Sequence, residues 1–201
     1  VLSGIITKGG VIAIIRVTYY LVGPDFIRGT WAQNTLLTLA IITVFMGSML
    51  AYKEKLLKRR LAYSTVSQVS YVLFGLFLLH PLGFLGALMQ VVFHAVAKNI
   101  LFLGAGAIIY KTGKTFVYEL KGLGKEMPIV MWTFAIASLS LIGIPPTAGF
   151  VSKWYLAQGG LQPDFGTLGL VGVAVLMVSA LLTAGYLLPI VSAAFFPGKD
   201  Y

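Results

Sequence analysis

Residues 145–153, PPTAGFVSK, place two adjacent prolines and a small-residue bend ahead of a lysine that has apolar residues on both sides. Proline lacks a backbone N–H and does not continue a helix interior, so Pro145 and Pro146 end one helix and free carbonyl groups of its last turn. Hydrocarbon tolerates free carbonyls only where protein or water satisfies them. Gly149 permits a sharp re-entry into a new helix, and Lys153 follows within one or two turns. The stretch predicts a broken helix with a charge beside the break.

The composition places this break inside a membrane. Of 201 residues, 58% are hydrophobic and only 10% are charged, and the mean hydropathy is +0.92, which exceeds the usual values for a water-soluble domain. Apolar segments run over residues 1–22, 33–52, 61–79, 83–110, 128–144, 147–161 and 166–196. Most can span about 30 Å of hydrocarbon, and the two short segments around the prolines are typical of a discontinuous helix. The sequence therefore predicts an all-α, polytopic transmembrane helical bundle with discontinuous helices.

The positive charge is concentrated in two connections. The formal net charge is +9, and nine of the fifteen Lys and Arg residues lie in 53–60 and 111–125. Two spans separate these connections, so they share a side, and the positive-inside rule makes that side cytoplasmic. The connections at 23–32 and 80–82 would then lie outside. The charge reflects topology in a lipid bilayer, and we expect no nucleic-acid partner. Beyond Pro145 the side on which each connection lies stays open, because a broken helix need not cross the membrane completely.

The residue inventory argues against catalysis by this chain. It has no cysteine, which excludes disulfides, thiolate zinc sites and cysteine-ligated iron–sulfur clusters. We expect no cofactor and no metal in this chain, so coupled redox chemistry would sit on another subunit. An enzyme working within the membrane would need a nucleophile–base pair, paired carboxylates or a metal cluster, yet the only histidines are His80 and His94. The six acidic residues lie in or beside connections: Asp25, Glu54, Glu119, Glu126, Asp164 and Asp200.

A few ionisable residues remain at membrane depth: Lys8, Arg16, His94, Lys98 and Lys153. A cation in hydrocarbon costs at least about 2.5–3.5 kcal/mol, so it normally faces a bundle interior, a partner or water. Lys8 lies about 14 residues, or roughly 21 Å of helix, before the end of its span. We interpret it as interior, with snorkelling to the other surface as the alternative. Arg16 is nearer its helix end, where snorkelling and function are both open.

Polar residues also follow one face of two neighbouring spans. Gln90, His94 and Lys98 are spaced i, i+4 and i+8, which predicts a polar stripe along a single helical face. The preceding span offers Ser64, Gln68 and Tyr71. These residues would line the facing wall of a hydrated path, or they are ordinary interhelical hydrogen-bonding groups. For Lys153 the alternative to a switchable proton carrier is an incidental interfacial lysine on a kinked helix.

Three ordered stretches resemble the signatures of the antiporter-like membrane subunits: LKRRLAYSTVSQVSY (57–71), HAVAKNILFLGAGAIIY (94–110) and GIPPTAGFVSKW (143–154). That family includes proton-pumping subunits of respiratory complex I, the A and D subunits of Mrp-type sodium/proton antiporters, and subunits of membrane-bound hydrogenases. GIITKGGVIAIIR (4–16) resembles the lysine-bearing broken helix of the family. The resemblance implies that 1–201 is part of one membrane domain, with six to seven transmembrane segments from the inverted-repeat fold of a larger protein.

The resemblance also implies roles for individual residues. Lys8 matches the lysine of a first half-channel, Lys153 the lysine or glutamate of a second, and His94 and Lys98 the relay between them. Lys58 matches a basic residue at the membrane edge.

The chain departs from its relatives at three places. Leu56 stands where many relatives have an acidic residue, and Gln90 where some have a second histidine. Span 33–52 has no relay lysine, so the hop from Lys8 towards His94 would need water or groups such as Gln33, Thr38 and Thr43.

The function implied by the resemblance is proton translocation within a multisubunit complex in a bacterial or archaeal plasma membrane. Protons would pass along Lys8, His94, Lys98 and Lys153, with Lys58, Ser64, Gln68, Tyr71 and Gln90 as auxiliary groups and Pro145, Pro146 and Gly149 forming the break. The driving process would be Na⁺ exchange or the redox chemistry of a quinone oxidoreductase or hydrogenase, with other membrane subunits as partners. The alternative is a secondary transporter for an anionic organic solute, in which Lys8 and Lys153 would be charge partners of the substrate.

Overall fold

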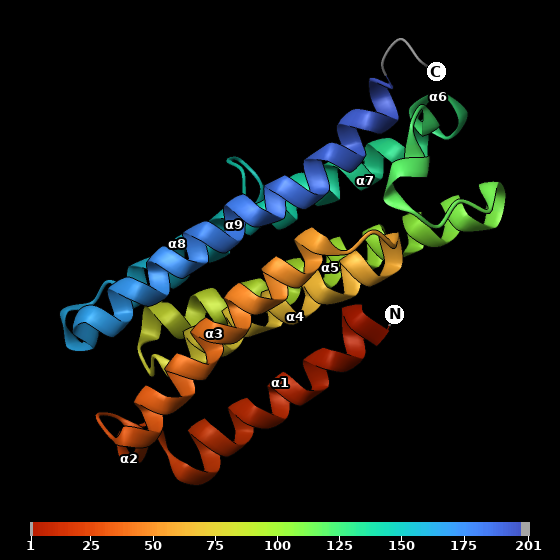
Figure 1. Ribbon diagram of the computed structural model, residues 1–201. Coiled ribbons are helices and arrows are strands. Elements are labelled where there is room, and N and C mark those ends of the chain that lie inside the picture. The colour runs from red at the N-terminus through yellow and green to blue at the C-terminus, as the bar shows by residue number, and fades with distance from the viewer. Residues whose placement is uncertain (1, 198–201) are drawn as a thin grey trace.

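The computed structural model describes residues 2–197 as a bundle of long helices that run roughly along one axis (Figure 1). The long elements are α1 (Thr7–Ile15, between π-helical segments Leu2–Ile6 and Arg16–Val22), α3 (Trp31–Lys53), α4 (Leu57–Phe77), α5 (Pro81–Thr112), α7 (Pro128–Ile142), α8 (Ala148–Gly160) and α9 (Gly166–Phe195). The short helices are α2 (Pro24–Ile27), α6 (Leu123–Glu126) and 3₁₀ turns at Val117–Leu120 and Pro163–Phe165. The predicted all-α bundle is confirmed, and Asp200 lies outside the described residues.

Among the described residues, four helical stretches are long and apolar enough to cross a membrane: Ser3–Val22, Trp31–Lys53, Pro81–Thr112 and Pro163–Phe195. Helix α4 is of similar length but begins with the three cations Lys58, Arg59 and Arg60. Six further polar residues along it are buried inside the bundle: Ser64, Thr65, Ser67, Gln68, Ser70 and Tyr71. The observed ends of the helices lie within about four residues of the predicted segments. The largest difference is at α4, which begins at Leu57, four residues before the predicted segment 61–79. The Leu57 N–H donates to Thr115 O at 3.0 Å, so one of the free N–H groups at the start of this helix has a partner.

Backbone hydrogen bonds show which connections share an end of the bundle. Val117 N donates to Lys55 O at 2.9 Å, and an antiparallel bridge joins Leu56 to Phe116. The two basic connections therefore lie side by side, as predicted. At the opposite end, Arg28 Nη2 donates to Leu79 O at 2.8 Å.

The broken helix crosses the bundle from one end to the other. Helix α7 starts at the basic end, and the turn after α8 contributes Asp164 to a cavity of about 900 Å³ that Arg28 and His80 also line, at the opposite end. Helix α9 then returns, because Gly122 N in the second basic connection donates to Ala193 O at 3.1 Å. Helices α7 and α8 thus form one interrupted span. The turn after α8 therefore lies at the end opposite the basic connections, a point that the sequence left open.

The first span differs from the expected broken helix. Its backbone is continuous, and Ile6 before α1 and Arg16 after it both have right-handed helical angles. The irregularity consists instead of π-helical segments on both sides of α1. Segment 2–22 contains no proline, so nothing removes its N–H donors, and the wider i→i+5 turns distort the helix without breaking it.

Candidate functional site

The helix break and Lys153 form one hydrogen-bonded unit. In a continuous α-helix the carbonyls of Leu141 and Ile142 would accept from residues 145 and 146. Both of those residues are proline, so neither carbonyl has a backbone donor there. Lys153 Nζ donates to Leu141 O at 2.6 Å and to Ile142 O at 2.7 Å. The lysine side chain thereby replaces the two donors that the prolines remove.

Two glycines allow α7 and α8 to approach closely at this break. Gly143 ends α7 with φ of 89°, in the left-handed region, and a Cβ added there would lie 2.9 Å from Lys153 Cδ. A Cβ at Gly149 would clash with the carbonyl oxygen of Ser140 in α7. A larger side chain at either position would push Lys153 away from the carbonyls that it contacts.

Lys153 also faces Tyr71. Its Nζ lies 5.2 Å from the centroid of the Tyr71 ring, which is a cation–π arrangement. The Tyr71 hydroxyl donates to Leu176 O of α9 at 2.8 Å. Both side chains border a mostly apolar cavity of about 510 Å³ between α4, α7, α8 and α9. Tyr71 therefore connects the surroundings of Lys153 to α9.

A chain of three buried polar side chains joins α4, α5 and α8. Gln90 Nε2 donates to Gln68 Oε1 at 2.7 Å, and Ser152 Oγ donates to Gln90 Oε1 at 2.5 Å. All three residues are at most 3% exposed. The sequence places Gln68 and Gln90 on facing walls, whereas it does not single out Ser152. Ser152 directly precedes Lys153, so this chain leads to the helix break.

Lys98 is fully buried and points towards the basic end of α4. Its Nζ donates to Leu61 O at 2.7 Å and to Ser64 Oγ at 2.6 Å. Within residues 2–197 no carboxylate pairs with this amine. Burying a charge without an opposite charge is expensive, so such a group is typical of a functional position rather than a stabilising one.

His94 lies one turn from both Gln90 and Lys98 on the buried face of α5. It is 2% exposed, and its Nε2 atom has no hydrogen-bond partner within the described chain. The charges that reach it are, in order of strength, those of Lys98, Lys8 and Lys153. Along the buried face of α5, His94 therefore lies between Gln90, which bonds Ser152, and Lys98, which bonds Ser64.

Lys8 is connected to this group through the π-helical segment Leu2–Ile6 and α4. Its Nζ donates to Ser3 O at 2.7 Å, and Ser3 Oγ lies 2.5 Å from Thr65 Oγ1. Thr65 is adjacent in the chain to Ser64, the partner of Lys98. Lys8 is 6% exposed, so it lies in the interior of the described bundle.

The structure places Gln33, Thr38 and Thr43 away from the expected link between Lys8 and His94, for which the sequence also allowed water. Gln33 binds carbonyls at the far end of α4, Phe77 O at 3.0 Å and Leu78 O at 3.2 Å. Thr38 and Thr43 are exposed, and each donates to a carbonyl of its own helix. A threonine hydroxyl can bond a carbonyl of its own helix or a group on a neighbouring helix, and the sequence does not show which. The sequence therefore indicated threonines that do not connect Lys8 with His94.

Helix α9 contributes a hydroxyl group that the sequence did not single out. Tyr186 is fully buried, its hydroxyl donates to Thr183 Oγ1 at 3.3 Å, and it also interacts with the Ser64 side chain. Two helical turns away, the Ser179 hydroxyl bonds those of Ser48 and Ser67. Ser179, Thr183 and Tyr186 lie in the strongly apolar α9, where isolated hydroxyl groups are a weak sequence signal.

The remaining predicted cations lie outside this buried set. Lys58 and Arg16 are exposed, so neither is placed next to the other site residues. Arg60 takes the inward position at the start of α4, because its Nη1 donates to Tyr186 O at 3.0 Å. His80 caps α5, with Nδ1 accepting from Leu82 N at 3.2 Å.

A bundle of apolar helices with a proline break and several buried cations is typical of a polytopic membrane protein. Residues 1–184 match the family described as NADH:quinone oxidoreductase/Mrp antiporter, transmembrane. The chain belongs to this family, which confirms the resemblance seen in the sequence.

Individual relatives come from both branches of the family. The chain is 38% identical over 203 residues to NADH-quinone oxidoreductase subunit N of Desulforudis audaxviator, covering 98% of this chain and 38% of that protein. It is 38% identical over 157 residues to the D subunit of the Na(+)/H(+) antiporter of Alkalihalophilus pseudofirmus, covering 77% of this chain and 31% of that protein. The chain therefore spans about a third of the length of these relatives.

The fold agrees with that of a solved complex. A chain in the structure of the Mrp complex from Dietzia sp. DQ12-45-1b superposes with a TM-score of 0.85 at 32% identity, covering 96% of this chain and 35% of that one. The comparisons give no support to the alternative of an anionic-solute transporter.

Proposed function

We propose that this chain forms the proton-conducting core of an antiporter-like membrane subunit, with Lys8, His94, Lys98 and Lys153 as proton carriers. The observation that carries this proposal is the set of polar contacts that the three lysines make inside the bundle. Lys8 connects through Ser3 and Thr65 to α4, and Lys98 connects through Ser64 to the same helix. Gln68, Gln90 and Ser152 continue towards Lys153.

The contacts of Lys98 suit an amine that gains and loses a proton. The Ser64 hydroxyl can either donate or accept, so it stays bonded to the Lys98 amine in both protonation states. The unpaired Nε2 of His94 is available to exchange a proton with a water molecule or a neighbouring group.

Repulsion between like charges would move the proton forward. Two positive groups that lie close together in a medium of low dielectric constant repel each other, so the arrival of a proton at one favours its release from the next. The charge of Lys8 reaches both Lys98 and His94, and that of Lys153 also reaches His94. A partner that changes the charge at one end of this row would therefore drive transfer along it.

The driving process would belong to the whole complex. One relative is named as part of a quinone oxidoreductase and another as part of an Na(+)/H(+) antiporter, so redox chemistry and Na⁺ exchange are both consistent with the proposal. Other membrane subunits would be the partners, the bacterial or archaeal plasma membrane the location, and any cofactor would sit outside this chain.

Everted vesicles that contain the complete protein and its partner subunits test this proposal. A dye would follow the pH gradient when sodium is added after energisation. Sodium-triggered collapse of the gradient, abolished by Lys8→Ala but kept in the exposed-cation control Lys125→Ala, indicates cation/proton exchange by this path. No sodium response in the wild type moves the coupling to redox chemistry. Unchanged proton transport in both Lys8→Ala and Lys153→Ala would refute the proposed carriers.

A further inference from the structure

A second charged site lies at the basic end of the bundle, away from the buried lysines. Lys55, Arg60 and Lys121 line a cavity of about 330 Å³ together with Val117, Tyr118, Pro189 and Ala193. Three cations thus share one small opening with apolar groups, and its lining contains no acidic residue. Such a combination fits a ligand that carries a negative head and an apolar body.

The frame of this cavity is fixed by backbone hydrogen bonds. Val117 N donates to Lys55 O, which holds the two basic connections together, and Gly122 N donates to Ala193 O, which holds the second connection against α9. The three cations therefore come from segments whose relative positions are set by the fold, rather than from independently moving loops.

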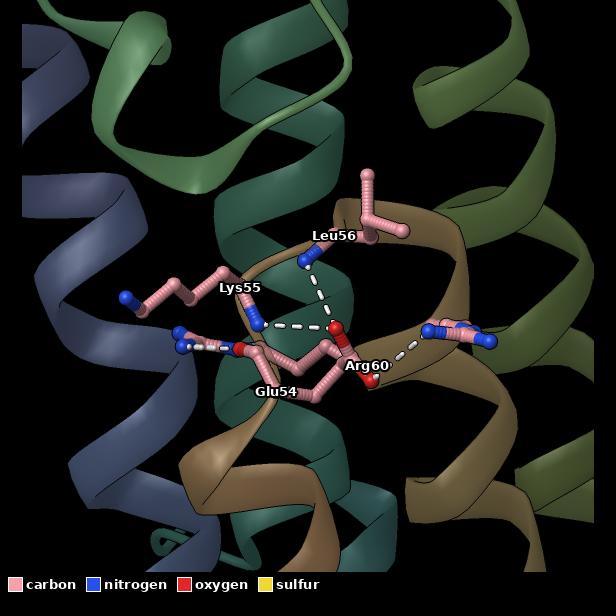
Figure 2. A network of polar contacts seen from close by, with 5 residues as sticks. Glu54, Lys55, Leu56 and Arg60 are labelled. Atoms are coloured by element: carbon pink, nitrogen blue, oxygen red, sulfur yellow. Dashed lines mark hydrogen bonds and ion pairs between the residues drawn. The ribbon is translucent and has the colours of Figure 1, made fainter.

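The nearby carboxylates are engaged elsewhere. Glu54 Oε1 accepts from the backbone N–H groups of Lys55 and Leu56 at 3.0 and 3.1 Å, and its Oε2 lies 3.7 Å from Arg59. Figure 2 shows Lys55 and Arg60 extending to one side, towards α9, while the Glu54 carboxylate faces the other way. Glu119 Oε2 accepts from the N–H groups of Thr115 and Phe116. The positive charge of the cavity is therefore left without an acidic side chain in its wall.

Arg60 is held so that part of its guanidinium remains available. Its Nε and Nη2 donate to Glu54 O at 2.8 and 2.6 Å, and its Nη1 donates to Tyr186 O. These bonds use three of the five N–H donors of the side chain. A planar guanidinium held in place by carbonyl oxygens is well suited to bind phosphate oxygens with its remaining donors.

The depth of the cavity matches the headgroup region of a bilayer. Helix α9 has 30 residues, which correspond to about 45 Å, the thickness of a bilayer with its headgroups. Pro189 lies six residues, or about 9 Å, before its end at the basic side. Tyr118 is 61% exposed, and tyrosine is enriched at this level of the membrane.

We propose that this cavity binds the phosphodiester headgroup of an anionic phospholipid, with Lys55, Arg60 and Lys121 as phosphate ligands and Pro189 and Ala193 against the start of the acyl chain. Basic pockets between helices at the cytoplasmic face are suited to such headgroups. This site does not depend on the proposed proton path, since its lining contains none of the four proposed carriers.

The test is a lipid titration of the complete purified protein, followed by native mass spectrometry. Phosphatidylglycerol is compared with phosphatidylcholine of the same acyl chains and with inorganic phosphate. The Lys55→Gln/Lys121→Gln variant is compared with Lys58→Gln/Lys125→Gln, which removes the same charge from the same two connections outside the cavity. Arg60 is left intact because its bonds to carbonyl oxygens also support the fold.

We expect phosphatidylglycerol to bind and to lose about 25-fold in affinity in the cavity variant, at about fivefold for each lysine, with a much smaller loss in the control. An equal loss in the two variants would reduce the effect to general surface charge and overturn the proposal. Equal binding of phosphatidylcholine would also overturn the proposal. If inorganic phosphate bound as tightly as the lipid, the cavity would instead be a site for a free anion. Absence of the lipid from the assembled complex, with a partner's acidic segment cross-linking to the cavity, would assign the site to a protein partner.

Discussion

Gln90 is the residue at which the two halves of the proposed path meet. Replacing it with leucine keeps the side chain a similar size but removes the partner of both Gln68 and Ser152. We expect Gln90→Leu to slow proton transport about tenfold, which corresponds to about 1.4 kcal/mol, or about 0.7 kcal/mol for each of the two hydrogen bonds lost. Transport in vesicles that contain the complete complex, normalised to the amount of assembled protein, would measure it.

The matched control for Gln90 is Gln158→Leu, since Gln158 lies outside the chain that joins α4, α5 and α8. The control should keep wild-type transport. If Gln90→Leu also kept wild-type transport while folding normally, the connection through Gln68 and Ser152 would have no part in conduction.

At the scale of an element, the break between α7 and α8 combines structure and transport in one lysine. Lys153→Met would leave the Leu141 and Ile142 carbonyls without a donor, at about 1–3 kcal/mol for each group. In a Pro145→Ala/Pro146→Ala background, the restored N–H groups have the same two carbonyls as their helical partners. We therefore expect Lys153→Met to lower thermal stability markedly in the native background and much less in the alanine background.

Proton transport separates the two roles of Lys153. Because a backbone amide cannot carry a proton as an amine does, Lys153→Met should abolish transport in both backgrounds. Stability is measured by thermal unfolding of the purified protein and transport in vesicles. Equal stability losses in the two backgrounds would mean that the lysine does not act as the substitute donor at the break.

For the whole molecule, the sequence predicted the architecture well because hydropathy and proline are strong signals. The segments that cross the bundle, the pairing of the two basic connections and the position of the break at Pro145 and Pro146 all follow from them. The continuous first span with its π-helical segments could not be predicted from these signals, because a π turn depends on packing and has no residue signature as strong as proline.

The polar interior was predictable on α5 and less so elsewhere. Gln90, His94 and Lys98 recur every fourth residue, so their shared face follows from helical geometry alone. Ser152, Thr65 and Tyr186 take part through contacts with helices far away in sequence, and their own neighbours do not reveal those partners. Whether the predicted site residues carry protons remains a prediction that the transport experiments address.

The complete crossing by α7 and α8 makes a prediction about sidedness that labelling can check. The chain has no native cysteine, so single cysteines give clear signals once any others in the complete protein are replaced. Lys114→Cys lies in the second basic connection, and Asp164→Cys lies in the turn between α8 and α9. Because one interrupted span separates them, an impermeant maleimide added outside intact cells should label position 164, while position 114 should react only in everted vesicles. A re-entrant α7–α8 pair that returned to its own side would instead place both cysteines on the cytoplasmic side, and both would then react only after eversion.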